Sequence, residues 1–293
     1  MNITRVWAFA RYEIRRATAR KKVLVLVVMT ILASTIPVIL IKSVGGSVAS
    51  SVVGPSGGSL LPPQDYPYMW VLGVFVVQGF FLPFTALLVA AGSMSEEYEQ
   101  GTAEVLLSKP VTRDDYFAGK FLGGFVLITV VILLGATLSV TASTFTFGAQ
   151  GALEALPPVV VSQVYSALVF FSVAFMSGEL LRRSSLSYIT ASAVYFVSEI
   201  AGAILRLIYG LTGDTFYKQI NVYLPTTPVT SLPLQVGLPE LPAGAKYLLS
   251  FIGTGPTETS VALSMGLIAI YAIVAVSIAR SYFNWVDVAK RVS

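Results

Sequence analysis

Six apolar runs, each about as long as a bilayer is thick, dominate the sequence. A transmembrane helix needs about 20 mainly apolar residues, because each residue adds about 1.5 Å to its length. The runs are 23–41, 68–92, 121–142, 159–181, 187–209 and 259–279. Only 12% of the residues are charged, against about 25% in soluble domains. The sequence therefore predicts an all-α integral membrane protein with six transmembrane helices in a single domain, residues 1–293.

Basic residues are shared unequally among the segments between these runs. Lys and Arg concentrate on the cytoplasmic side of membrane proteins. With both termini in the cytoplasm, the inner segments hold about five times as many cations as the outer ones, which carry only Lys42, Lys218 and Lys246. We therefore expect N- and C-termini in the cytoplasm.

The first segment, residues 1–22, is basic and amphipathic. Ile3, Val6, Trp7 and Ala10 follow helical spacing, and seven cations accompany them. This pattern predicts a helix that lies along the inner membrane surface, with Trp7 in the interface. The n-region of a signal peptide is the alternative, but the next run is long and no clear cleavage site follows it.

The segment 210–258 is the longest outside the runs and is rich in Pro and Thr. It contains two apolar stretches, 216–224 and 245–252, which are too short to cross a bilayer. We expect short external helices that lie at the outer leaflet.

Residues 95–118 form the one densely charged interval between long runs, so they must lie in water on one side of the bilayer. Met94, Tyr98 and Val105 share a helical face, whereas Glu96 and Glu97 point elsewhere.

The same interval carries signals for a break between two helices. Gly101 can bend the chain before a short helix at 102–108, and Pro110 ends that helix. Thr112 then has the character of an N-cap, with Asp114 and Asp115 in the first turn of the next helix. The interval is predicted to protrude as an ordered helix–break–helix structure.

This pattern resembles the first intracellular loop in the membrane subunits of type-2 ABC exporters. The matching residues are Glu96, Glu97, Glu99, Gly101, Thr102, Glu104, Leu106, Leu107, Pro110, Gly119 and Lys120. The resemblance covers nearly the whole chain when the six-helix plan is included, and it implies the type V-like exporter fold. It implies that 95–118 is the coupling loop, in which Glu96, Glu97, Glu99, Gly101, Thr102, Glu104, Leu106, Leu107 and Pro110 contact an ATPase. A solvated loop without a partner is the alternative.

The resemblance also implies the partners and the location. Two ATP-binding subunits and a second permease copy, or a related permease, would complete an exporter in the plasma membrane of a prokaryote. The chain has no Cys, no His and no GxxxxGK[ST] motif. Thiol chemistry, His-based zinc sites and a P-loop are thereby excluded. We expect no catalytic residue, metal site or cofactor on this chain, with ATP and Mg on the partner, and nothing indicates nucleic-acid binding.

Polar residues inside the runs are candidates for a translocation path. Such residues are costly in a bilayer and face other helices or a cavity. The resemblance places the second and fifth spans around the path, which selects Gln78, Phe81, Phe84, Tyr195 and Glu199. Ordinary helix packing is the alternative for each of them.

Two other classes of function use different residues of the chain. An ion-coupled secondary transporter would use Glu199 and Arg206, seven residues apart on one helical face. No inverted repeat supports it. The second class is an intramembrane enzyme. The chain has no His, no Cys and no carboxylate pair that its sequence brings together, which argues against such an enzyme. The sequence identifies neither the transported substrate nor, apart from the resemblance, the direction of transport.

Overall fold

The computed structural model describes residues 2–52, 63–76, 81–108, 111–243, 245–246, 249 and 259–286. The regular structure within these ranges is helical. The α-helices are α1 (Ile3–Ala19), α2 (Lys22–Val52), α3 (Trp70–Val76), α4 (Leu82–Glu99), α5 (Thr102–Leu107), α6 (Arg113–Phe147), α7 (Leu156–Leu181), α8 (Ser184–Thr212), α9 (Thr215–Val222), α10 (Thr226–Gly237) and α12 (Val261–Trp285). Short 3₁₀ helices lie at Pro63–Tyr68 (η1), Leu153–Ala155 (η3) and Leu238–Glu240 (η4).

Five segments are long and apolar enough to cross a membrane. They are Lys22–Lys42, Arg113–Phe147, Leu153–Leu181, Ser184–Thr212 and Val261–Trp285. Four of the six predicted runs lie wholly within them, and a fifth, 259–279, does so from Val261 onward. The remaining run, 68–92, is divided between α3, which has 7 residues, and α4, which has 18 residues and includes three glutamates. Neither helix is by itself a candidate span, because α3 is too short and α4 carries too much charge.

The segment 210–258 differs from the prediction in one helix. Of the second predicted stretch, 245–252, only residues 245, 246 and 249 are described. α9 lies where the first short helix was expected, but α10 covers residues predicted to be loop. Pro228 is the third residue of α10, where its missing N–H costs no hydrogen bond, and Pro233 lies inside the helix. α10 packs on α7 and α12, and its Ser231 hydroxyl lies 3.1 Å from that of Ser264. Tertiary packing therefore stabilises a helix that proline content argues against.

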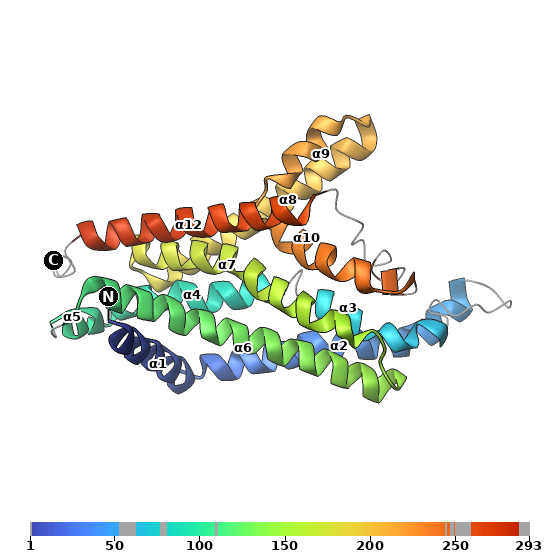
Figure 1. Cartoon of the computed structure of the whole chain (residues 1–293), viewed down its shortest axis with the longest axis horizontal. Coiled ribbons are helices and arrows are strands. Elements are labelled where there is room, and N and C mark those ends of the chain that lie inside the picture. The colour runs from blue at the N-terminus through green and yellow to red at the C-terminus, as the bar shows by residue number, and fades with distance from the viewer. Residues whose placement is uncertain are drawn as a thin grey trace.

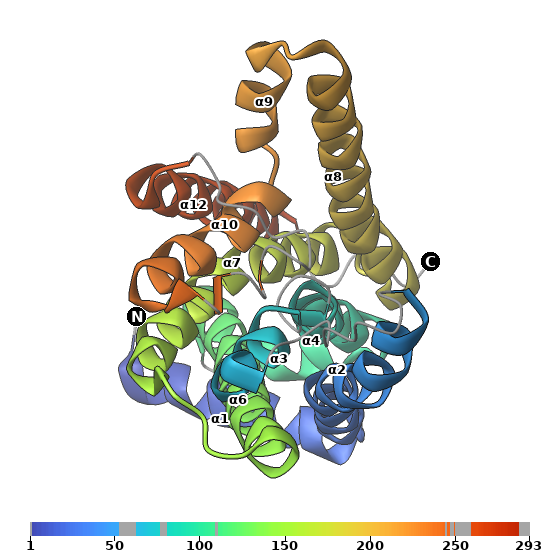
Figure 2. The ribbon, with the colours of Figure 1, turned by 90° about the vertical axis from the view of Figure 1, so that its right-hand side faces the viewer.

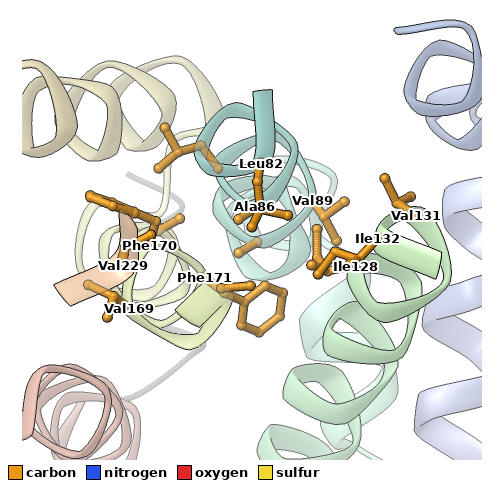
Figure 3. Close-up of a cluster of buried hydrophobic side chains, with 14 of the residues drawn as sticks. Leu82, Ala86, Val89, Ile128, Val131, Ile132, Val169, Phe170, Phe171 and Val229 are labelled. Carbon is orange, nitrogen blue, oxygen red and sulfur yellow. The ribbon is translucent and has the colours of Figure 1, made fainter. Parts of the chain in front are cut away.

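The apolar core lies where α4, α6 and α7 meet. Figure 3 shows Phe171 of α7 between α4 and α6, with Phe170 facing Val229 of α10. The other labelled side chains are Leu82, Ala86, Val89, Ile128, Val131, Ile132 and Val169. α4 is thus surrounded, and it packs against α5, α6, α7 and α8.

α1 lies tightly across α6 at two glycines of α6, Gly119 and Gly123. A Cβ placed on Gly119 would come within 2.7 Å of the Val6 carbonyl oxygen. A Cβ on Gly123 would come within 2.7 Å of the Ala10 carbonyl oxygen. The contact is between backbones, so a side chain at either position has no room.

The long helices run roughly along one axis, and one end of the molecule gathers α1, α5, the start of α6 and the last turn of α12 (Figure 1). Arg113 donates to the carbonyl oxygens of Phe283 (3.0 Å) and Asn284 (3.3 Å), which fixes the end of α12 to the start of α6. α8 and α9 project from the rest of the bundle (Figure 2). We call the end that holds α5 the α5 end.

Candidate functional site

The charged interval has the predicted helix–break–helix form. Gly101 takes a left-handed conformation with φ of 67°, which ends α4 and lets α5 begin at Thr102. The Thr112 hydroxyl caps α6 by accepting from the backbone N–H of Asp115 at 3.1 Å. Asp115 in turn accepts from the backbone N–H of Asn2 at 2.8 Å, which links the start of α6 to α1. Pro110 lies outside the described residues.

Glu97 is the centre of a buried charge cluster made of Glu13, Arg16, Glu97 and Lys120. The Arg16 guanidinium lies 2.7 Å from Glu97 and 3.2 Å from Glu13. The Lys120 ammonium pairs with both carboxylates, and Tyr116 donates its hydroxyl to Glu97. The side chains of Glu97 and Lys120 are fully buried, so two cations and two anions balance one another away from water.

The cluster explains the charge state of Arg16. Burial lowers the pKa of its guanidinium, but the carboxylates of Glu13 and Glu97 outweigh burial and hold the pKa above its ordinary value. Arg16 also donates to the carbonyl oxygens of Gly92 (3.1 Å) and Ser93 (3.0 Å). The cluster therefore joins α1, α4 and α6 through buried ion pairs.

Glu96 lies one residue earlier and bonds to different helices. It pairs with Arg20 and Lys22 at the α1–α2 turn and accepts from the Tyr188 hydroxyl of α8 at 3.0 Å. Burial raises the pKa of Glu96, but the hydrogen bond and charge of Lys22 lower it below its ordinary value.

Tyr98 and Glu99 contact the turn between α7 and α8. The Tyr98 hydroxyl donates to Glu179 at 2.7 Å, and the Arg182 guanidinium lies 4.5 Å from the centre of the Tyr98 ring. Burial, then the charge of Glu179, raise the pKa of Tyr98. Glu99 accepts from the backbone N–H (2.8 Å) and the hydroxyl (2.6 Å) of Ser184, at the first turn of α8.

The four consecutive residues Glu96 to Glu99, which we call the stem, therefore bond to five other helices. Successive residues of an α-helix point about 100° apart, so four of them face nearly every direction around α4. Because α4 is surrounded by other helices, each side chain meets a different neighbour. The stem connects α5 mechanically to α1, α2, α6, α7 and α8.

The predicted apolar face was wrong in two respects. Met94 is buried and Tyr98 mostly so, but Val105 is 63% exposed and Glu97 is fully buried. The break at Gly101 starts a new helix, so the spacing of Met94 and Tyr98 does not continue to Val105. On α5, Glu104 is exposed, whereas Leu106 and Leu107 are half-buried against the core. Thr102 is half-buried, and its hydroxyl lies 3.4 Å from the Glu97 carbonyl oxygen.

Sequence reasoning passed over Glu13, Arg16 and Lys120 as members of a buried cluster. One signal was present, because Glu13 lies at helical spacing with Val6, Ala10 and Ala17 and is thus on the apolar face of α1. An acidic residue at such a position needs a buried cation.

The structure brings together some of the residues that were predicted to line a translocation path. The rings of Phe84 and Tyr195 lie 5.3 Å apart, and Tyr195 is only 3% exposed. An apolar groove of about 340 Å³ between α2, α4 and α8 is lined in the described part of the chain by Phe81 and Phe84, but not by Tyr195 or Glu199. The groove is also lined by Leu26, Met29, Thr85, Leu87, Leu88, Tyr188 and Ser192. Glu199 is half-buried and Arg206 is exposed. Gln78 lies outside the described residues.

Comparison with models of protein families gives a match over most of the chain. A family model described as ABC-2 family transporter protein matches residues 7–288. No curated protein matches the chain. The matched range includes α1 from Trp7 onward, the stem, α5 and all five candidate spans. The chain therefore belongs to the ABC-2 family of transporter membrane proteins, whose members are non-catalytic transport subunits.

Proposed function

We propose that this chain is the permease subunit of an ATP-driven exporter, that two copies form the translocation path, and that each copy docks an ATPase subunit on α5. The family implies an ATPase partner. The observation that carries the docking site is an exposed short helix on a firmly held support. Glu104 and Val105 are exposed at the α5 end, while the stem behind them bonds to five helices.

This arrangement suits the transfer of movement. A helix that is pushed by a partner moves the membrane helices only if its connection to them is stiff. Gly101 provides a sharp bend between α4 and α5. Four residues before the bend, the buried ion pair of Glu97 with Lys120 fixes the end of α4 to α6. Closure of the ATPase pair would then shift α5 with the inner halves of the spans as a rigid-body movement.

In this proposal the six runs form six spans, with α3 and α4 together as the second. Both termini and α5 lie in the cytoplasm. α10 and the α8–α9 projection face the outside. The five-to-one excess of cations in the inner segments supports this orientation.

The translocation path would follow the groove between α2, α4 and α8, with Phe81 and Phe84 on its wall. The second copy would meet the apolar face of α8. Ile189, Val197 and Ile200 of that face are 64%, 66% and 58% exposed. In this arrangement Tyr195 supports Phe84 from behind, and Glu199 is a residue of the α8–α10 contact, near Ser198 and its partner Thr226.

The test is the association of the chain with its ATPase in native membranes. Val105→Asp places a carboxylate where an apolar contact is expected, and Glu104→Lys reverses the exposed charge. Burying one valine contributes about 1.5 kcal/mol or more, so each variant should lower ATPase recovery about tenfold. Ser281→Asp, an exposed change on α12 at the same end, is the matched control. Unchanged recovery with Val105→Asp would remove α5 as the docking site.

A further inference from the structure

α1 has two faces of different chemistry. Its inward face packs on α6 and is formed by Val6, Ala10, Glu13 and Ala17, all buried. Its outward face carries two large apolar side chains, Ile3 at 82% exposed and Trp7 at 48%. Arg11 and Arg15 are exposed beside them, and the Arg11 guanidinium lies 5.7 Å from the centre of the Trp7 ring.

The position of α1 fits a membrane surface. The first candidate span begins at Lys22, directly after α1, so α1 lies where that span leaves the bilayer. Lys21 has a φ of 58°, which makes a turn between α1 and α2. α1 slants across the edge of the bundle at the α5 end (Figure 1). The exposure of Ile3 and Trp7 shows that its outward face lies away from the other helices.

The cations of α1 are divided between the two faces. Arg16 and Arg20 form ion pairs with the stem. Arg5, Arg11 and Arg15 of α1 and Lys21 in the turn after it are exposed, and within the described ranges none of the four forms an ion pair. The outward face is therefore both net positive and apolar.

We propose that the outward face of α1 binds the headgroups of anionic phospholipids, and that this contact positions the stem through the buried charge cluster. The second half of this statement rests on the proposed function, in which the stem supports α5. Charge complementarity selects the occupant. Each basic residue near an anionic bilayer surface contributes about 1 kcal/mol, and apolar side chains beside the cations can enter the acyl boundary.

The route from lipid to α5 consists of residues already described. Glu13 and Arg16 lie on the inward face of the same helix, and both bond within the cluster to Glu97 or Lys120. Glu97 precedes the bend at Gly101 by four residues. We expect a shift of α1 on the bilayer surface to move the stem. The buried ion pairs of the cluster connect the two, and breaking such a pair would leave a charge without a partner and without water.

The binding half is tested on the purified chain in nanodiscs, without an ATPase. The chain has no Cys, so Ala8→Cys on exposed α1 gives a single attachment point for a fluorophore. Lipid-borne quencher then reports how deeply α1 lies in discs of phosphatidylcholine alone or with added phosphatidylglycerol. We expect stronger quenching with phosphatidylglycerol, which weakens at high salt. Arg11→Gln and Arg15→Gln should each lower the apparent lipid affinity about fivefold.

Arg183→Gln is the matched control, because it removes one exposed cation at the same end but not on α1. It should leave quenching unchanged. Equal quenching in neutral and anionic discs would overturn lipid binding by α1. So would a loss of quenching in the Arg183→Gln control as large as that in the Arg11→Gln and Arg15→Gln variants. If the arginine variants instead lose a bound acidic protein and no lipid response, the occupant is a protein and the proposal fails.

The transmission half is tested on the complex with the ATPase. Phosphatidylglycerol should change the rate of ATP hydrolysis in the wild-type complex, and this dependence should disappear in Arg11→Gln/Arg15→Gln. Glu97→Gln, and the charge-neutral pair Glu97→Gln/Lys120→Met, should keep the quenching response but lose the lipid dependence of hydrolysis. Retained dependence in both would overturn transmission through the cluster. Failure of the chain to bind any ATPase would refute the proposed function while leaving the quenching result intact.

Discussion

At the scale of residues, the buried charge cluster is the feature with the largest energetic consequence. The Lys120 side chain is fully buried, and its ammonium pairs with two carboxylates, those of Glu13 and Glu97. Replacing a whole buried ion pair by apolar groups is often neutral, whereas removing one partner leaves a charge buried alone. The stability of the cluster therefore depends on balance rather than on any one pair.

This balance gives a prediction for Lys120. Lys120→Met should destabilise the folded chain by about 3–5 kcal/mol, because it leaves Glu13 and Glu97 with one cation between them. Lys120→Met combined with Glu97→Gln should recover most of that loss, since Glu13 and Arg16 remain paired. Thermal unfolding in detergent measures both. A double variant no more stable than the single one would contradict charge balance as the cause.

At the scale of elements, the contact between α1 and α6 depends on two glycines. Gly123→Val would place a branched side chain against the Ala10 backbone and separate the helices at the level of the cluster. We expect α1 to become accessible to protease and the midpoint of thermal unfolding to fall. Gly266→Val in α12 is the control, because nothing lies within 4 Å of its added Cβ. If α1 of the Gly123→Val variant resists protease as well as α1 of the wild type does, the close contact at Gly123 does not hold α1 on α6.

Elements also show what sequence could and could not predict. The N-cap at Thr112 and the bend at Gly101 are local signals, and both are confirmed. α10 was missed because its prolines are tolerated only in the presence of α7 and α12. Glu97 was expected to face water because charged side chains normally do. Its partner Lys120 lies 23 residues away in the sequence, and local sequence patterns do not predict contacts over that separation. Five of the six long apolar runs coincide with candidate spans, because the length of an apolar run is a local property. The run 68–92 is the exception, since it is divided between α3 and α4.

At the scale of the whole molecule, the described helices place α1, α5 and the end of α12 together, with α9 far from them (Figure 1). Single cysteines can test this arrangement directly, because the chain has none of its own. In intact cells, Val105→Cys should resist a membrane-impermeant thiol reagent, whereas Phe216→Cys, 57% exposed on α9, should react. Permeabilised cells should label both. Reaction of Val105→Cys from outside would reverse the proposed topology.

The order in which the ribosome delivers the cluster has its own consequence. Glu13, Arg16 and Glu97 are synthesised before Lys120, and so is the first candidate span, Lys22–Lys42. Until α6 has been synthesised, the carboxylates of Glu13 and Glu97 have only the Arg16 cation as a partner within the cluster. We therefore expect them to remain hydrated until then. We therefore expect the buried contacts among α1, α4 and α6 to form during translation only after residue 120 has been synthesised.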